Sequence, residues 1–212
     1  MKLLQATGGH GAREEAEPKK LKLYSYWLSS CSCRVRIGLD LKGLEYEYVA
    51  VNFPEAEQQT PEFLKLNPMG YVPVLVDGDI VLADSFAILL YLDEKFPQHP
   101  LLPKDSVRRA INFQAANVIS SSIQPRQLML QHMREKLGPQ EAIACAQDDL
   151  RTGFAALEKL LKDYSGRYAT GNEVFLDEFP LLSRLFEAYM ELPAFQDNMP
   201  GKQPDTPAEH RV

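Results

Sequence analysis

The sequence contains few cysteines, no long apolar run and no dense cluster of positive charge, and each shortage excludes a class of protein. Three cysteines among 212 residues do not make a disulfide framework, so we expect a reducing, cytoplasmic setting. No apolar run approaches the roughly 18 residues that a membrane span requires, so no membrane partner is expected. A net charge of −6 argues against nucleic acid as a main partner.

Residues 1–19 lack the patterns of a targeting segment and of a packed element. They contain neither the apolar core of a signal peptide nor the Arg/Ser-rich amphipathic helix of a transit peptide. Their glycines and charged residues carry no apolar period, so we expect a disordered tail. The segment from Pro200 to Val212 is rich in proline and poor in apolar residues, and we expect it to lie as an extended tail or to hang free.

The part of the chain from residue 20 to residue 102 shows the pattern of an α+β domain. Residues 21–25 and 45–51 alternate apolar and polar side chains as strands do. Between them, apolar residues at i, i+4 spacing predict a helix that ends at Gly43. This stretch therefore predicts a βαβ unit.

The rest of this domain predicts a hairpin and a second helix. Two apolar runs, 72–76 and 80–82, are separated by Asp77-Gly78, a strong signal for a tight hairpin. A helix follows from Ser85 until Pro97 stops it. The order βαβ, then ββ, then α predicts a thioredoxin-like domain.

From residue 103 to residue 212 the strand patterns disappear and helical patterns replace them. Residues 105–136 predict a long helix that is interrupted or kinked near Pro125. Residues 140–164 carry an apolar stripe at helical spacing, and residues 178–190 predict a shorter helix. We therefore expect an all-helical second domain.

A turn of small residues from Ser29 to Cys33 joins the first strand to the first helix. It gathers hydroxyl groups and a thiol where the first N–H groups of the helix are unpaired and partly positive, which favours anions such as a thiolate. The same residues are also what a serine-rich N-cap requires, without any chemistry. Cys31 and Cys33 are one residue short of the spacing of the thioredoxin redox motif.

Several motifs give the chain a resemblance to the soluble glutathione transferases, and most closely to the zeta class, also called maleylacetoacetate isomerase. These motifs are Ser29-Ser-Cys-Ser-Cys-Arg-Val-Arg36, Leu66-Asn-Pro-Met-Gly-Tyr-Val-Pro73, Ala83-Asp-Ser-Phe-Ala-Ile88, Ile123-Gln-Pro125 and Gln203-Pro-Asp-Thr-Pro207. The resemblance extends from about Lys20 to Pro207. It implies the cytosolic glutathione transferase architecture, glutathione as the cofactor and a homodimer.

The resemblance also implies a role for particular residues. Ser29 would donate a hydrogen bond to the glutathione sulfur, and Cys31 would assist without being the essential nucleophile. Val72, before a cis-proline, would pair with the cysteinyl backbone of glutathione. The other residues implied in glutathione binding are Ser30, Arg34, Gln58 (or the adjacent Gln59), Asp84, Ser85 and Gln124. Taken alone, Asp84 and Ser85 also fit a simple helix cap.

The implied reaction is the glutathione-dependent isomerisation of maleylacetoacetate to fumarylacetoacetate, a step in tyrosine and phenylalanine breakdown. The glutathione thiolate adds to the cis double bond, the resulting single bond rotates, and elimination returns the thiol. Transferase side activity is also implied. A general detoxifying glutathione transferase that acts on electrophiles is a second hypothesis.

One departure from the family pattern lies at the junction of Leu176 and Asp177. The family has a further helix and loop here, whereas this chain runs directly into what resembles the next helix. We therefore expect the helical domain to be truncated internally. A third hypothesis follows, a non-catalytic isoform that binds glutathione weakly or partners full-length subunits.

Overall fold

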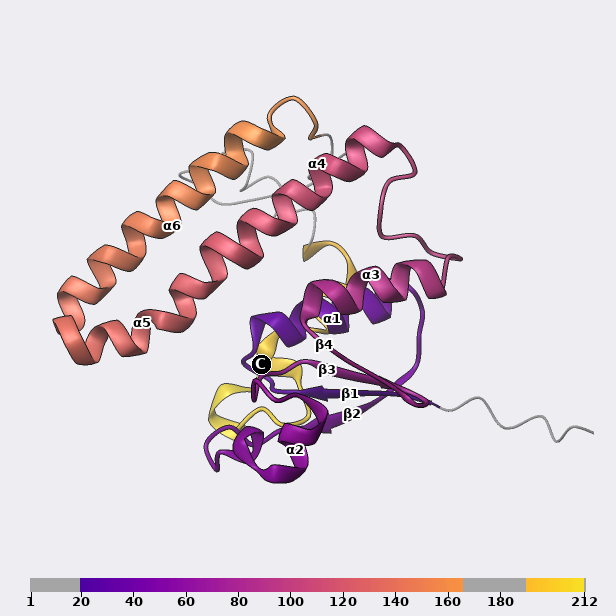
Figure 1. Ribbon diagram of the computed structural model, residues 1–212, viewed down its shortest axis with the longest axis horizontal. Coiled ribbons are helices and arrows are strands. Elements are labelled where there is room, and N and C mark those ends of the chain that lie inside the picture. The colour runs from indigo at the N-terminus through magenta and orange to yellow at the C-terminus, as the bar shows by residue number, and fades with distance from the viewer. Residues whose placement is uncertain (1–19, 166–189, 212) are drawn as a thin grey trace, which may run out of the picture.

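The computed structural model describes residues 20–165 and 190–211, and its first part is built on a four-stranded mixed sheet (Figure 1). The strands are β1 (Leu21–Ser25), β2 (Tyr46–Ala50), β3 (Val74–Asp77) and β4 (Ile80–Ala83), in the order β2-β1-β3-β4. Strand β1 pairs parallel with β2 and antiparallel with β3, and β3 pairs antiparallel with β4. The predicted thioredoxin-like arrangement is confirmed.

Two helices, α1 (Ser30–Leu41) and α3 (Ser85–Lys95), lie together on one face of this sheet (Figure 1). The core between the helices and the sheet is made of buried aliphatic side chains: Leu21, Leu23, Val35, Leu39, Leu75, Ile88 and Leu92. The short helix α2 (Pro61–Leu66) adds Phe63 to a second cluster with Val51, Val72 and Val74. Burial on both sides fixes the sheet between its helices.

The predicted limits of the first helix and the hairpin are close to those observed. Ser29 caps α1, and Gly43 follows its end with a φ of +65°, a left-handed conformation that glycine adopts readily. The two-residue hairpin loop is Gly78-Asp79, one position later than predicted, because Asp77 still pairs with Ile80. The turn therefore places its positive φ, +64°, at Gly78.

The helical part contains α4 (Ser106–Asn117), the π-helix η2 (Val118–Ile123), α5 (Gln124–Leu137) and α6 (Pro139–Leu161). The interruption predicted near Pro125 is confirmed, and it takes the form of η2, which ends just before Gln124. Proline has no N–H and so removes one helical hydrogen bond from the preceding turn. Figure 1 shows α5 and α6 as an antiparallel pair. Gly138 joins them, as the C-cap of α5 and the N-cap of α6.

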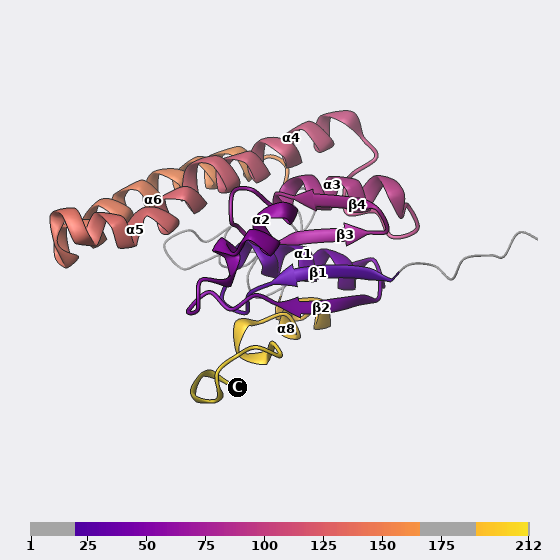
Figure 2. The same ribbon diagram turned by 60° about the horizontal axis from the view of Figure 1, so that its bottom comes forward.

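The prediction for the C-terminal residues is wrong. Residues 190–211 form α8 (Pro193–Gln196) and the 3-10 turns η3 (Pro200–Lys202) and η4 (Ala208–His210). Figure 2 shows this segment packed beside β2 and below α1, neither extended nor free. Asn198 and Asp205 accept hydrogen bonds from residues of the sheet domain, and these polar contacts hold the segment there.

Three predictions fall outside the described residues. These are the tail over residues 1–19, the junction at residues 176–177 and, apart from Met190, the helix over residues 178–190. Within residues 20–165 and 190–211, no helix is long and apolar enough to cross a membrane. The same residues contain no group of three His, Cys, Asp or Glu side chains that could hold a metal ion.

A close contact between Gly153 of α6 and Ile123 of η2 is open to a stability test. A methyl group added at Gly153 would lie 2.4 Å from Ile123 Cγ1, and Ile123 is buried and stiff at χ1. We expect Gly153→Ala to lower the free energy of unfolding by about 1–3 kcal/mol in chemical denaturation, whereas the same change in an open helix stabilises it by about 1 kcal/mol.

Gly38→Ala is the matched control for this variant. An added methyl group there would meet the terminal Cδ2 of Leu89, which can rotate away, so the loss should be smaller. A Gly153→Ala protein as stable as the unsubstituted one would mean that α6 and η2 can shift apart without loss.

Candidate functional site

The first turn of α1 places Ser29, Ser30 and Cys31 next to one another at the end of β1. The Oγ of Ser29 accepts a hydrogen bond of 3.1 Å from the Ser32 N–H, so Ser29 is the N-cap of α1. A hydroxyl group that accepts through a lone pair keeps its own proton for a second partner. The capping role and the predicted donor role of Ser29 are therefore compatible.

A hydrogen-bond network joins the beginnings of α1 and α3 to the residue that follows η2. Arg34 donates to Ser85 Oγ and to Gln124 Oε1, each over 2.9 Å, and Gln124 Nε2 donates to Ser30 Oγ over 2.8 Å. Ser85 and Gln124 are buried. The planar guanidinium group suits this double contact because its N–H groups diverge in fixed directions. Four predicted site residues are thereby brought together.

The N-terminus of α3 begins with Asp84 in an unusual conformation. Its φ of +74° lies in the left-handed region, which is costly for a residue other than glycine and is concentrated at ligand-binding positions. One carboxylate oxygen, Oδ1, accepts from the N–H groups of Phe86 (3.0 Å) and Ala87 (2.9 Å). Asp84 is exposed, so its second oxygen faces solvent at a helix terminus.

Two further predicted residues lie on separate elements. The peptide bond between Val72 and Pro73 is cis, as predicted. Gln58 lies on the 3-10 turn η1 (Glu57–Gln59), and its buried Oε1 has no hydrogen-bond partner among the described residues. The side chain of Gln59 instead packs against Gly70. A buried carbonyl oxygen without a donor is costly, so Gln58 is the better candidate to receive an N–H from a ligand.

Cys33 lies near the C-terminal segment. Its Sγ donates to the carbonyl oxygen of Asn198 over 3.3 Å. Burial raises the pKa of the Cys33 thiol, and the nearby Arg36 opposes this only in part. Cys33 is therefore a protonated, hydrogen-bonded thiol at neutral pH, and all three cysteines are free.

Sequence reasoning missed two residues that support this site. Asn198 and Asp205 both come from the C-terminal segment and contact the residues on either side of Ser29 along the chain. The one signal available was the Gln-Pro-Asp-Thr-Pro motif at residues 203–207, which carried the resemblance but no assigned role.

Comparison with known proteins gives close matches along most of the chain. A family model described as the N-terminal domain of glutathione S-transferase matches residues 19–94. The chain is 55% identical over 215 residues to a zeta-class glutathione S-transferase of Euphorbia esula, covering 91% of this chain and 96% of that protein. It is 40% identical over 211 residues to the maleylacetoacetate isomerase of Rattus norvegicus, covering 90% of this chain and 97% of that protein.

Solved structures give the same result. The maleylacetoacetate isomerase of Anaeromyxobacter dehalogenans, with bound GSH in its active site, matches with a TM-score of 0.78 and 38% identity, covering 89% of this chain and 98% of that one. A bacterial zeta-class maleyl pyruvate isomerase in its holo form matches with a TM-score of 0.80 and 34% identity, covering 88% of this chain and 100% of that one.

The state of Cys33 gives a chemical prediction. Because the pKa of Cys33 is raised, the fraction of reactive thiolate is low at neutral pH. This fraction grows only when the pH rises above the ordinary pKa of a cysteine thiol. We expect iodoacetamide to modify Cys33 about tenfold more slowly than the exposed Cys145 between about pH 7 and 9, as measured by peptide mass spectrometry. Equal rates for the two residues would contradict the burial and hydrogen bonding of Cys33.

Proposed function

Because the chain belongs to the zeta class of the glutathione transferases, we propose that it catalyses the glutathione-dependent isomerisation of maleylacetoacetate to fumarylacetoacetate. Relatives named maleylacetoacetate isomerase match along nearly their whole length. The observation that carries the proposal is the network of Ser30, Arg34, Ser85 and Gln124, which joins both parts of the chain beside Ser29.

The residues at this site fit a tripeptide that carries two carboxylates, an ammonium group and a thiol. The solvent-facing oxygen of Asp84 suits the ammonium group, and Ser85 with the first N–H groups of α3 suits a carboxylate. The unpaired Oε1 of Gln58 accepts an amide N–H, and the backbone of Val72 pairs with the peptide as an added strand. These are the roles that we propose for glutathione binding.

Ser29 is the residue that we propose for activating the thiol. Its hydroxyl proton is free to be donated to sulfur, and the N-terminus of α1 adds a partly positive environment. Both effects favour a thiolate over a thiol. Bound glutathione supplies the thiol whose reversible addition allows the substrate double bond to rotate. Cys31, half-buried on the same turn, assists without acting as the nucleophile.

Gln124 connects this chemistry to the helical part of the protein. It is buried, and its amide is held at both ends, by Arg34 at Oε1 and by Ser30 at Nε2. The contact of Gly153 with Ile123 sets the position of the preceding π-turn. We propose that Gln124 faces the substrate from the helical domain while Arg34 contributes positive charge for a dicarboxylate.

The domain limits, oligomeric state and location belong to the same proposal. We propose a glutathione-binding domain over residues 20–102, a helical domain over residues 103–212, and a cytoplasmic homodimer. The alignment with the Euphorbia esula protein has 215 positions, more than the 91% of this 212-residue chain that enters it. That relative therefore has residues without a counterpart here, which supports an internal shortening of this chain.

The proposal predicts that isomerisation depends on the Ser29 hydroxyl group. We expect Ser29→Ala to lower kcat/KM for maleylacetone, an analogue of the substrate, by about 100-fold, because a donor to the developing charge is lost. The lost N-cap costs only about 1 kcal/mol, so the variant should remain folded by circular dichroism. Ser29→Thr keeps the hydroxyl group and should retain part of the activity.

The outcomes distinguish the hypotheses. Cys145→Ala, a change at an exposed thiol of α6, should leave the activity unchanged. Undiminished activity in Ser29→Ala would mean that another residue activates the thiol. A folded protein that binds glutathione but does not isomerise the analogue would be a detoxifying transferase if it conjugates electrophiles, and a non-catalytic isoform if it does not.

A further inference from the structure

A carboxylate from the C-terminal segment holds the turn that precedes Ser29. Asp205 Oδ2 accepts from the backbone N–H of Trp27 over 2.9 Å, and Asp205 Oδ1 accepts from the hydroxyl group of Tyr48 over 2.6 Å. Burial, together with the hydrogen bond to Asp205, raises the pKa of Tyr48, which keeps this phenol protonated as the donor. Asp205 therefore ties the turn to strand β2.

The turn in question is short, so a contact at Trp27 also restrains Ser29. It runs from Tyr26 to Ser29 and is closed by a 3.0 Å hydrogen bond from the Ser29 N–H to the Tyr26 carbonyl oxygen. Trp27 and Leu28 are the two residues between, and Leu28 is 57% exposed. The side chain of Leu28 is too exposed to hold the turn by packing. The backbone N–H of Trp27, bound to Asp205, is therefore the contact that holds the turn next to Ser29.

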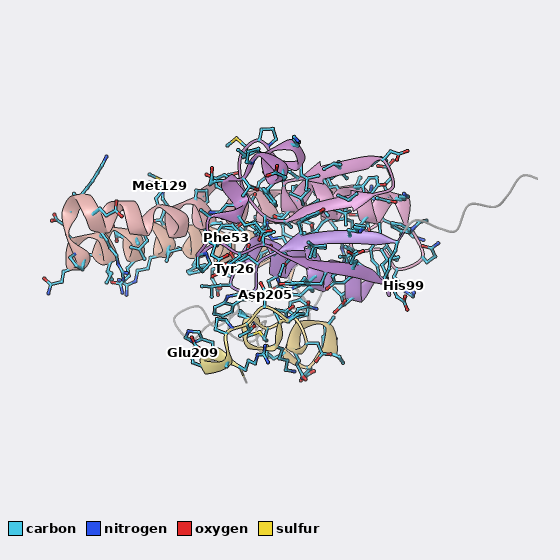
Figure 3. The ribbon with its side chains drawn as sticks, turned by 90° about the horizontal axis from the view of Figure 1, so that it is seen from below. Tyr26, Phe53, His99, Met129, Asp205 and Glu209 are labelled. Atoms are coloured by element: carbon cyan, nitrogen blue, oxygen red, sulfur yellow. The ribbon has the colours of Figure 1, made fainter. Side chains whose placement is uncertain are left out.

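A row of four aromatic rings packs along the same turn. Tyr26 stacks on Phe53 with a centroid distance of 4.7 Å and meets Trp27 edge-on at 5.9 Å. Trp27 in turn stacks on His210 of the C-terminal segment at 5.5 Å. Figure 3 shows Phe53, Tyr26 and Asp205 close together where the C-terminal segment meets the sheet, at the end opposite His99.

The C-terminal segment is itself well anchored, so it can act as a support. Asn198 donates to Asp40 Oδ2 over 2.6 Å, and its carbonyl oxygen accepts from the buried Arg36 over 3.1 Å. Between Asn198 and Asp205, the amide of Gln203 donates to the carbonyl oxygens of Asp197 and Met199, each over 3.0 Å. Asn198 therefore binds the segment to α1, and Gln203 holds the backbone between Asn198 and Asp205, so the position of Asp205 relative to α1 is fixed.

We propose that Asp205 is a positioning residue for thiol activation: by holding the Trp27 backbone against β2, it sets the place of the Ser29 hydroxyl group. The inference rests on the proposed role of Ser29. A hydrogen bond to an ionised acceptor is about twice as strong as a neutral one, which suits a contact that must hold a half-buried turn. Hydrogen bonds weaken steeply with distance and angle, so a small displacement of Ser29 weakens its donation to sulfur.

The first test uses the free protein and its single tryptophan. Since Trp27 is the only tryptophan in the chain, its fluorescence reports on this turn alone. We expect Asp205→Ala to shift the Trp27 emission to longer wavelength and to increase its quenching by iodide, because the turn is released. Asp205→Asn should stay close to the unsubstituted protein, because its amide still accepts from Trp27 and donates to Tyr48.

The second test measures the ionisation of bound glutathione through the ultraviolet absorbance of its thiolate, without any turnover. We expect Asp205→Ala to raise the thiol pKa by about one unit, which is a tenfold loss of thiolate near neutral pH. The glutathione affinity should change much less, since Gln58, Val72 and Ser85 are untouched. Asp205→Asn should restore the thiol pKa, and Tyr48→Phe, which leaves the Trp27 contact, should have a smaller effect.

Two controls separate this role from simple stabilisation of the segment. Asp197→Ala removes an exposed carboxylate of the same segment, which pairs with Lys202 at 3.3 Å, and should change neither signal. His210→Ala removes the ring on Trp27 but not the backbone contact, so it should alter the fluorescence and leave the thiol pKa in place.

The inference is overturned if Asp205→Ala changes the Trp27 signal while the thiol pKa stays the same, since the contact would then be only structural. It is also overturned if Asp205→Asn behaves like Asp205→Ala, because charge and not position would then matter. A protein that ionises glutathione but does not isomerise maleylacetone refutes the proposed reaction and leaves this inference standing. A protein that binds no glutathione refutes both.

Discussion

A fully buried guanidinium group connects three parts of this molecule. Arg36, with no exposed surface, donates to Ser25 Oγ at the end of β1 over 3.0 Å and to the Asn198 carbonyl oxygen over 3.1 Å. A buried cation that loses its partners is strongly destabilising, so these contacts constrain the surrounding backbone. The end of β1, the helix α1 and the C-terminal segment are thereby fixed relative to one another. The turn bearing Ser29 lies between these fixed parts.

Arg34, on the same helix, binds residues in other parts of the molecule. Arg34 is only partly buried and reaches away from the C-terminal segment, toward Ser85 and Gln124. Two arginines separated by a single residue thus make different long-range contacts. Arg36 binds the C-terminal segment, and Arg34 binds Gln124 of the helical part. This explains how a site built on a short turn is held by residues far apart in the sequence.

Local sequence signals predicted the sheet and its helices because capping and periodicity act over a few residues. Ser29 and Gly43 bracket α1, and an apolar stripe marks α6. The long-range polar contacts have no such signal. Arg36 and Lys42 belong to residue types that normally face solvent, yet both are buried, Lys42 against Asp93. For the same reason the proline-rich C-terminal segment was wrongly expected to be free. Its anchors are single polar side chains, and composition alone does not show where they bind.

The chain's direction of synthesis gives the C-terminal anchor a further consequence. Trp27 and Arg36 leave the ribosome before their partners Asp205 and Asn198, which lie 178 and 162 residues further along the chain. The sheet and the helices α4 to α6 can form from local contacts in the meantime, as domains do during translation. The sheet can therefore form before Asp205 is available to accept the hydrogen bond from the Trp27 N–H, so this restraint on the turn before Ser29 is added late in synthesis.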